Sequence, residues 1–392
     1  MKIIYYCQHV LGMGHYFRSL EICKALVGHD VILVSGGMPM AAPTPAHVRV
    51  VALPDLHMDP DFSRFETADG ALGNIDDIRR VRRRMLLDLV MSERPDVFMV
   101  ELFPFGRKAF GFELKPVLAA VHDVKPRVTR VVCSLRDILV EKPDAQAYEE
   151  RVVTLLNRWF DALLVHSDPG LVRLDETFSR LADIRIPVVY TGFVTPRPPP
   201  EDRIAIRRRL GVQDADMLIV ASAGGGRVGF MLLDAAVCAV PMMTDAAVRL
   251  QVFTGPFMED AEVRKLEAMA SGRVRISRFT PDFTAWLSAA DLSISMAGYN
   301  TCMNIAAAGV RSLVWPFSQN REQRLRAEKI AAGGGMRILE DAELEPERLA
   351  LLMTELLSDK TRPEYRVNLD GAAYTTGWIG GWTGIGGCDR VS

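Results

Sequence analysis

A short run of small and polar residues late in the chain has the composition of an anion-binding turn. Gly298-Tyr299-Asn300-Thr301 directly follows the apolar run Leu292–Met296. The apolar run predicts a strand, the glycine predicts a turn, and Asn300 or Thr301 would begin a short helix. The first turn of a helix offers free backbone N–H groups and the positive end of the helix dipole, which attract phosphates. This segment therefore predicts a phosphate site.

A second glycine-rich loop lies between two other predicted elements. Gly224-Gly225-Gly226-Arg227 follows the apolar run Met217–Ala221 and precedes a helical stretch, Phe230–Val240. Three glycines allow the backbone to approach a diphosphate closely, and Arg227 would add charge-assisted bonds. Alone, the loop is better interpreted as a tight turn with a solvated arginine. Together with the run at Gly298, it favours a diphosphate site.

Near the start of the chain, Gly12-x-Gly14-His15 connects a predicted strand, Lys2–Cys7, to a predicted helix, Phe17–Leu26. A lone Gly-x-Gly is a weak signal, because many such turns need glycine only for their backbone geometry. At a helix start the dipole favours the neutral imidazole, so that His15 would keep a ring nitrogen able to accept a proton. A capping or packing histidine is an equally good interpretation of the motif alone.

Glu101 ends the apolar strand Val97–Glu101. A partly buried carboxyl has a raised pKa and can act as a base or orient His15. The alternative is a carboxylate paired with Arg107 or Arg136. His166 and Asp168 also follow a strand, and they fit either the lining of a substrate site or a hydrogen-bonded pair.

The elements that would position these residues alternate between short apolar runs and amphipathic helices. Such alternation predicts parallel strands covered on both faces, that is, doubly wound α/β domains whose ligands lie beyond the carboxyl ends of the strands. Both predicted domains would present these ends to one cleft. The predicted strands are Lys2–Cys7, Asp30–Ser35, Val97–Glu101, Arg130–Ser134, Ala162–His166 and Val188–Tyr190, followed by Met217–Ala221, Arg249–Phe253, Val274–Ser277, Leu292–Ser295 and Ser312–Trp315.

The proline-rich segment Thr195–Pro200 interrupts this alternation and predicts a linker. The expected domains are residues 1–195, a linker at 196–204, a second domain at 205–365 and a tail at 366–392. A chain of 392 residues fits two domains of this size. The stretch Gly377–Ser392, rich in Gly and Trp, has no helical periodicity and predicts a disordered or altered end.

Composition excludes some functions. The net charge of −2 argues against a dedicated nucleic-acid binder. The six cysteines are scattered without a C-x-x-C pair, which fits a reduced cytoplasmic compartment. No segment has the length of a membrane span or a signal-peptide core.

Taken together, the motifs resemble the GT-B glycosyltransferases. The residues that carry the resemblance are Gly12-x-Gly14-His15-x-x-Arg18, the loop Gly224–Gly226, and Gly298-Tyr299-Asn300-Thr301 with Ala306–Gly309, Pro316 and Glu322-Gln323. The chain is most similar to enzymes like the bacterial cell-wall lipid-linked N-acetylglucosaminyltransferase and to predicted glycosyltransferases of that superfamily. The similarity covers roughly residues 1–372, and the last motif is the most specific.

The resemblance implies a two-domain, metal-independent enzyme without a cofactor, whose second domain binds a UDP- or dTDP-linked sugar. Asp59-Pro60-Asp61 is accordingly expected to be a turn, not a metal-binding pair. The two glycine motifs would hold the diphosphate, the backbone near Arg278 and Phe279 would meet the base, and Glu322-Gln323 would bind the sugar. The residues expected to bind the nucleotide sugar are Gly14, Gly224, Gly225, Gly226, Arg227, Arg278, Phe279, Gly298, Tyr299, Asn300, Thr301, Asn304, Glu322 and Gln323.

One position departs from the family. A glutamate that binds both ribose hydroxyls is expected where this chain has Asn304. A neutral acceptor forms weaker hydrogen bonds, by about 1–2 kcal/mol, so that donor affinity would fall roughly tenfold. The glutamate pair of retaining relatives is also missing, at Met296 and Asn304, which favours inverting transfer. A deoxyribonucleotide donor such as a dTDP-sugar is a further hypothesis.

Inverting transfer needs a base for the acceptor hydroxyl. His15 is the first candidate and Glu101 the second. The acceptor would be a glycan, a lipid-linked sugar or a small molecule. The basic run Arg79–Arg84 is best interpreted as a solvated helix face, with contact to an anionic lipid headgroup as the alternative. The expected location is the cytoplasm, with peripheral contact at the inner face of the cell membrane as an option.

Other functions remain open at this stage. A nucleotide-sugar hydrolase would use His15 to activate water. A nucleotide-sugar 2-epimerase has the same architecture. A binding protein would hold a nucleotide sugar without turnover.

Overall fold

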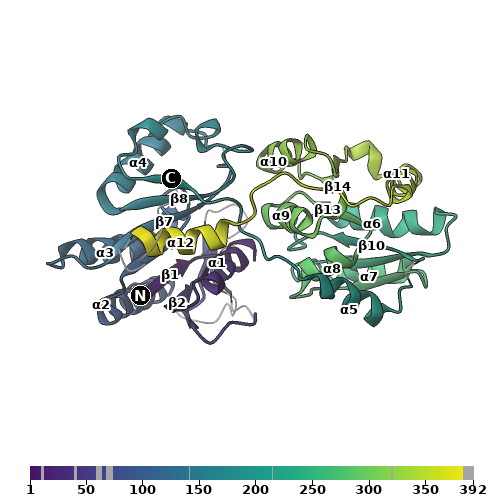
Figure 1. Cartoon of the computed structure of the whole chain (residues 1–392). Coiled ribbons are helices and arrows are strands. Elements are labelled where there is room, and N and C mark those ends of the chain that lie inside the picture. Colours follow the sequence, from purple (N-terminus) through teal and green to yellow (C-terminus); the bar gives the residue numbers. More distant parts are fainter. Residues whose placement is uncertain are drawn as a thin grey trace. The chain divides into compact units, whose positions relative to one another are not determined.

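The computed structural model describes residues 1–9, 13–38, 42–58, 64–67, 74–140, 142–213, 215–318 and 321–382. Two compact units divide the chain (Figure 1). Unit 1 comprises Met1–Val194 and Asn368–Ser392, and unit 2 comprises Thr195–Val367. Each unit contains a parallel sheet of its own, as predicted for doubly wound domains.

Unit 1 is built on a sheet in the order β3-β2-β1-β6-β7-β8-β9, with every neighbouring pair parallel. Its strands are β1 (Lys2–Cys7), β2 (Asp30–Ser35), β3 (Val48–Ala52), β6 (Val97–Glu101), β7 (Arg130–Arg136), β8 (Ala162–His166) and β9 (Val188–Tyr190), beside the small antiparallel pair β4 (His57–Met58) and β5 (Phe65–Glu66). Its helices are α1 (Gly14–Ala25), α2 (Ile75–Glu93), α3 (Gly111–Asp123), α4 (Ala145–Trp159) and α12 (Gly371–Trp382), with 3₁₀ turns η1 (Lys108–Phe110), η2 (Leu174–Glu176) and η3 (Leu181–Asp183).

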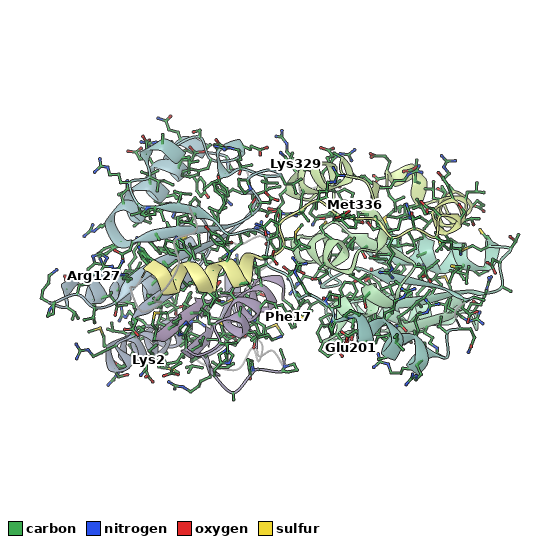
Figure 2. All side chains as sticks on the ribbon, in the orientation of Figure 1. Lys2, Phe17, Arg127, Glu201, Lys329 and Met336 are labelled. Carbon is green, nitrogen blue, oxygen red and sulfur yellow. The ribbon has the colours of Figure 1, made fainter. Side chains whose placement is uncertain are left out.

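Unit 2 has the strand order β12-β11-β10-β13-β14-β15, again parallel throughout. Its strands are β10 (Met217–Ser222), β11 (Val248–Phe253), β12 (Val274–Ser277), β13 (Leu292–Met296), β14 (Arg311–Trp315) and β15 (Met336–Ile338). Its helices are α5 (Pro200–Leu210), α6 (Phe230–Ala239), α7 (Asp260–Met269), α8 (Phe283–Ala289), α9 (Tyr299–Ala308), α10 (Arg321–Ala331) and α11 (Pro346–Ser358), with η4 (Val240–Met242) and η5 (Asp341–Leu344). In Figure 2, Lys2 marks the amino end of β1 in unit 1 and Met336 that of β15 in unit 2.

Both faces of the first sheet are buried. Ile4 and Tyr6 of β1 pack into one core cluster, whereas Ile3, Tyr5 and Cys7 pack into a second cluster. Alternate side chains of a strand point to opposite faces, so a strand that is apolar throughout must be covered on both sides. The continuous apolar runs of the sequence follow from this burial.

Each sheet reverses its strand order once. In unit 1 the chain proceeds outward from β1 to β3 and then continues from β6 on the other side of β1. In unit 2 the same reversal lies between β10 and β13. Loops at the carboxyl ends of the two strands that flank a reversal diverge and leave a crevice for ligands. His15, Glu101 and the two glycine motifs lie at the ends of these four strands.

The structure corrects three sequence-based interpretations of local structure. The edge strands β3 and β15 were not predicted. Helix α5 begins at Pro200, inside the range expected to be linker, because proline is favoured in the first helical turn. The C-terminal segment is helical as far as Trp382, although no helical periodicity was recognised beyond Gly377; residues 383–392 lie outside the described part of the chain.

Helix α12 belongs to unit 1 and packs against α1 (Figure 1). Thr375 and Ile379 are buried, and Trp378 stacks on Trp382 with ring centroids 4.7 Å apart. The guanidinium of Arg130 lies 4.5 Å from the Trp382 ring centroid. The small residues between these anchors therefore form a packed helix.

The basic run on α2 is not a uniform solvated face. Arg82 is fully buried and donates to Glu113 on α3, to Gln8 after β1, and to the carbonyls of Gly36 and Pro54, at 2.6–2.9 Å. The prediction of a solvated cluster is wrong for this residue. No described helix is long and apolar enough to cross a membrane.

Candidate functional site

In unit 1, two predicted residues meet at the reversal of the strand order. His15 lies in the first turn of α1, after β1, and Glu101 ends the neighbouring strand β6. His15 Nδ1 and Glu101 Oε1 are 2.6 Å apart. Arg18, one turn further along α1, donates from Nη2 to the same carboxylate oxygen. The other glycine of this loop, Gly12, lies outside the described residues.

Charges and burial determine the protonation of this pair. Burial, with the charges of Arg107 and Arg18, lowers the pKa of His15 to about 3, against the opposing effect of Glu101. Burial alone would raise the pKa of the Glu101 carboxyl, but His15, Arg18 and Arg107 outweigh it and lower that pKa. At neutral pH the imidazole is therefore neutral and the carboxylate ionised.

The hydrogen bond assigns the tautomer. An ionised carboxylate only accepts hydrogen bonds, so Nδ1 carries the imidazole proton and donates it to Glu101. The lone pair of His15 is then on Nε2, which bonds to no residue that the structure describes. The side chain of His15 is 20% exposed, whereas Glu101 is fully buried. This arrangement can remove a proton from a hydroxyl group.

The alternative prediction that Glu101 pairs with Arg107 or Arg136 is wrong, because its hydrogen bonds are to His15 and Arg18. Its ion pair is with Arg18. Arg107 affects Glu101 through its charge without a hydrogen bond, and Glu101 Oε2 has no hydrogen-bond partner among the described residues. Arg18 was recognised only as part of a motif; its spacing of three residues from His15, on the same helix face, is the signal that could have assigned it a role.

His166 and Asp168 have structural roles. His166 is fully buried and hydrogen-bonds Ser134 at 2.7 Å and Thr191 at 2.8 Å. Asp168 accepts from the backbone N–H groups of Gly170 and Asn368, which tethers the returning C-terminal segment. His166 and Asp168 therefore do not form the hydrogen-bonded pair that was the alternative interpretation, since each bonds to other residues.

In unit 2, the glycine loop after β10 packs tightly against the loop after β11. Gly226 has φ +91°, and a Cβ there would lie 2.5 Å from the Thr254 carbonyl oxygen. Gly255 has φ +87°, and a Cβ there would lie 2.5 Å from Gly224 O. The N–H of Phe257 donates to Gly225 O at 2.9 Å. The glycines are thus required by backbone conformation and by close approach.

The loop leaves donors available. The N–H of Gly225 has no acceptor in the described part of the chain, and a Cβ at Gly225 would meet only Phe257 at 3.6 Å. Arg227 is exposed, with its guanidinium 5.4 Å from the Phe257 ring centroid. A phosphate could therefore approach both the backbone and a cation here.

The second predicted anion site begins helix α9. The helix starts at Tyr299, one residue before the predicted start, with Gly298 as its N-cap and no capping side chain. The first-turn amide of Thr301 has no acceptor within the helix, and the first turn contains no acidic residue. Because β10 and β13 are adjacent, this turn and the glycine loop follow neighbouring strands at the same edge of the sheet.

Of the other residues predicted to bind the donor, Arg278 and Phe279 lie beside the loop at Gly255, whereas Gly14 lies in the other unit. The loop at Gly255 lies between Arg278 and the glycine loop, because Gly255 N donates to Arg278 O at 2.8 Å. The Arg278 side chain forms an ion pair with Asp260. Phe279, beside it, is 41% exposed. Gly14 lies in unit 1, as the first residue of α1, and its nucleotide contact stays a prediction.

Two side chains expected to bind the donor already have protein partners. Asn304 accepts a 2.8 Å hydrogen bond at Oδ1 from Thr195 Oγ1, and Gln323 accepts at Oε1 from Phe317 N at 3.1 Å. Each amide therefore presents its NH₂ group to a ligand. Glu322 lies beside Gln323 in the first turn of α10. Thr195 was not predicted, because it stands within a proline-rich segment without a motif.

A cavity of about 700 Å³ lies at the opposite, amino ends of β10, β13 and β14. Three arginines that line it donate hydrogen bonds at the C-terminal ends of helices. Arg203 and Arg207 donate to Ala289 O and pair with Asp291. Arg362 donates to Ala308 O and Ala290 O. Cations at helix C-termini stabilise the terminal carbonyls. This cavity is therefore structural. Among the described residues, no three His, Cys, Asp or Glu side chains gather as a metal-ligand set.

Two doubly wound units, each with its polar loops at the reversal of the strand order, define the GT-B fold of glycosyltransferases. Solved structures share this fold over almost the whole chain. The calicheamicin glycosyltransferase CalG4 has a TM-score of 0.55 at 16% identity, over 95% of this chain and 91% of that chain. MurG of Acinetobacter baumannii has a TM-score of 0.53 at 17% identity, over 96% and 95%.

Sequence similarity concentrates in unit 2. Residues 222–369 match the glycosyltransferase family 28 C-terminal domain. The UDP-N-acetylglucosamine–N-acetylmuramyl-(pentapeptide) pyrophosphoryl-undecaprenol N-acetylglucosamine transferase of Acidothermus cellulolyticus is 30% identical over 162 residues, which are 38% of this chain and 41% of the relative. The enzyme of that name from Mesorhizobium japonicum is 32% identical over 143 residues, 36% and 38%. The matched segments thus span about 40% of the length of these relatives. The predicted resemblance to the GT-B glycosyltransferases is confirmed.

Proposed function

We propose that the protein is an inverting, metal-independent glycosyltransferase that moves a sugar from a nucleoside-diphosphate sugar to an acceptor hydroxyl. The observation that carries this proposal is the hydrogen bond between His15 and the ionised Glu101, which leaves His15 Nε2 as a free base. Unit 1 supplies this base and the acceptor site. Unit 2 supplies the donor site.

In this reaction, the acceptor oxygen attacks the anomeric carbon while its proton passes to His15 Nε2. The bond between the anomeric carbon and the diphosphate breaks, and the configuration of that carbon inverts. Glu101 stabilises the imidazolium that forms, because its carboxylate accepts the Nδ1–H bond. Arg18 keeps the carboxylate ionised and oriented.

The leaving diphosphate gains one negative charge, which needs stabilisation. Thr301 in the first turn of α9 and Gly225 in the glycine loop offer N–H groups, and Arg227 offers a cation. Oriented dipoles of this kind can replace a metal ion in stabilising a leaving group. The predicted roles of Arg278, Phe279 and Gln323 at the base and sugar are part of this proposal.

The donor base is either uracil or thymine. The curated relatives carry UDP-N-acetylglucosamine in their names, and a structural neighbour is the spinosyn rhamnosyltransferase SpnG complexed with thymidine diphosphate. Asn304 favours thymidine diphosphate sugars, because Thr195 occupies one acceptor site of its carbonyl oxygen and a neutral amide accepts from ribose hydroxyls more weakly than a carboxylate would.

The acceptor is a glycan, a lipid-linked sugar or a small molecule. The relatives' name includes a pyrophosphoryl-undecaprenol acceptor. A cytoplasmic location with peripheral membrane contact would suit a lipid-linked acceptor. Pelleting with anionic liposomes tests that contact, and the exposed Arg80, Arg83 and Arg84 on α2 are the cations to replace.

The decisive experiment combines nucleotide identification with product analysis. Purified protein is examined by mass spectrometry for retained nucleotide, and thermal shifts are measured with UDP- and dTDP-sugars. The donor that stabilises the protein is then incubated with candidate acceptors, and a glycosylated product is expected. Free sugar without acceptor would instead indicate a hydrolase, an interconverted donor an epimerase, and binding without turnover a binding protein.

A further inference from the structure

The loop between β6 and α3 is fixed by contacts on both sides. Phe103 and Phe105 are buried, and their carbonyls accept from Cys133 Sγ and from the Tyr148 hydroxyl at 3.3 and 2.9 Å. Gly106 N donates to Leu102 O at 2.9 Å. The loop is therefore a rigid support for the residue at its end, Arg107.

Arg107 has a backbone conformation that arginine rarely adopts. Its φ is +56°, in the left-handed region, where a residue with a side chain is strained. The conformation is held in place because Arg107 O accepts from Phe110 N at 2.9 Å. Backbone strain of this kind is concentrated at functional sites.

The Arg107 guanidinium lacks a protein partner. Its Nε is buried without a hydrogen bond, and no described residue bonds its terminal nitrogens, which stay accessible. Its charge acts on Glu101, His9 and His15, so that it lies within electrostatic range of the base. Burial lowers its pKa, which shows that the cation is poorly solvated. A poorly solvated, unpaired cation is unfavourable unless an anion binds to it.

Glu101 does not fill this role. Its Oε1 already accepts from His15 and Arg18, and its Oε2 forms no bond with Arg107 in the described structure. The planar guanidinium therefore remains free to bind a carboxylate or phosphate through two parallel hydrogen bonds.

We propose that Arg107 forms an ion pair with an anionic group of the acceptor, a carboxylate or a phosphate, beside the hydroxyl that His15 deprotonates. This inference rests on the proposed glycosyl transfer and narrows its acceptor to an anionic one. Arg107 would hold the acceptor while the base acts, and the pairing would remove the cost of its unpaired charge.

The test measures anion binding apart from the donor site. The protein is first saturated with whichever of UDP and dTDP binds more tightly, so that the diphosphate loops are filled. Inorganic phosphate is then added at constant ionic strength, its binding is followed by ³¹P NMR line broadening, and acetate is tested as a competitor. The variants are R107A and R107K, with K108A as the matched control, because Lys108 is the adjacent, exposed cation.

The wild type and K108A are expected to bind phosphate equally. Loss of charge-assisted hydrogen bonds weakens R107A at least about tenfold, and R107K, which lacks the planar fork, falls between them. Competition by acetate would assign a carboxylate-bearing acceptor as well, and its absence a phosphate-bearing one.

Equal phosphate affinity in all four proteins overturns the inference. The inference is also overturned if R107A changes the pKa values of the His15–Glu101 pair but leaves phosphate binding unchanged, because Arg107 would then act only through its charge on Glu101. If R107A does not fold, R107K decides by the same comparison. A wild type that binds neither UDP nor dTDP overturns the proposed function itself, which is a separate outcome.

Discussion

His15 and Glu101 are 86 positions apart in the sequence, and a 2.6 Å hydrogen bond joins His15 Nδ1 to Glu101 Oε1. They meet because β1 and β6 are parallel neighbours at the reversal of the strand order, so that the helix after β1 begins beside the end of β6. The polar loops of unit 2 follow β10 and β13, which stand in the same relation. The fold thus repeats one arrangement, at which we propose a base in unit 1 and a diphosphate site in unit 2.

Replacing either member of the pair should remove the base without removing the donor site. We expect His15→Ala and Glu101→Gln each to reduce turnover at least about a hundredfold, because proton transfer in the transition state is lost. Nucleotide affinity, measured by thermal shift, should not change, since the donor residues belong to unit 2. His29→Ala is the control, a histidine before β2 at the other end of the strands. Near-normal turnover in either variant would remove that residue from the mechanism.

The protonation of His15 gives a pH prediction. Burial first, then nearby charges, lower its pKa from 6.5 to about 3, so the folded state keeps the imidazole neutral while the unfolded chain protonates it near pH 6.5. The unfolded state binds more protons between these values, and this contribution to stability is complete above pH 6.5 and is lost as the pH falls toward 3. In ¹³C-labelled protein, the His15 ring signal, assigned with His15→Ala, should not titrate between pH 8 and 5. A midpoint between pH 6 and 7 would contradict the neutral base.

The strands that are buried along their whole length are the elements that the sequence predicts most accurately. The central strands are runs of apolar residues, and each was predicted within about two residues of its observed end. In the edge strand β3 (Val48–Ala52) only Val48 is buried, and β15 has only three residues after a glycine turn. A half-exposed or very short strand lacks the apolar run, which is why both were missed.

Side-chain pairing is less predictable than strand position. The meeting of His15 and Glu101 follows from topology, but the choice of Arg18 as the ion-pair partner depends on rotamers and packing. Arg82 is different, because a signal was available: it precedes Leu86 and Val90 at intervals of four, on the buried stripe of α2. The run Arg79–Arg84 was interpreted from its number of charges alone, and the four-residue spacing of Arg82 from Leu86 and Val90 was therefore overlooked.

Arg82 should therefore be a stability residue and not a membrane contact. We expect Arg82→Ala to lower the free energy of unfolding by about 3–5 kcal/mol, because it leaves the buried carboxylate of Glu113 unpaired. Urea denaturation followed by circular dichroism measures the change. Arg84→Ala is the matched control on the same helix, since that side chain is 83% exposed, and it should have no measurable effect. A destabilisation equal to that of the control would contradict the structural role.

The glycine loop allows backbone and ligand effects to be separated. Gly226→Ala should destabilise unit 2 by more than about 2 kcal/mol, because a left-handed residue gains a Cβ in contact with the Thr254 carbonyl. Gly225→Ala is its control, since the new Cβ meets only Phe257 at an ordinary distance. Thermal unfolding should be normal for Gly225→Ala, and any loss of nucleotide affinity in that variant reports how closely the diphosphate approaches the loop. Equal unfolding of the two variants would show that the loop conformation is not required.

The last prediction concerns the choice of nucleotide. Thr195 Oγ1 donates to Asn304 Oδ1 at 2.8 Å, so one acceptor site of this neutral oxygen is already occupied and at most one remains for a ribose hydroxyl. A carboxylate at this position would accept from both ribose hydroxyls, and one charge-assisted bond is worth about 1.5–3 kcal/mol. We therefore expect the wild type to bind dTDP at least as tightly as UDP, and Asn304→Glu to strengthen UDP binding roughly tenfold relative to dTDP. Isothermal titration calorimetry gives both affinities, and Thr195→Val, which frees the Asn304 carbonyl without adding a charge, should shift the ratio toward UDP by less. Tighter binding of UDP by the wild type would rule out a thymidine diphosphate donor, because the 2′-hydroxyl would then be recognised despite the bond to Thr195.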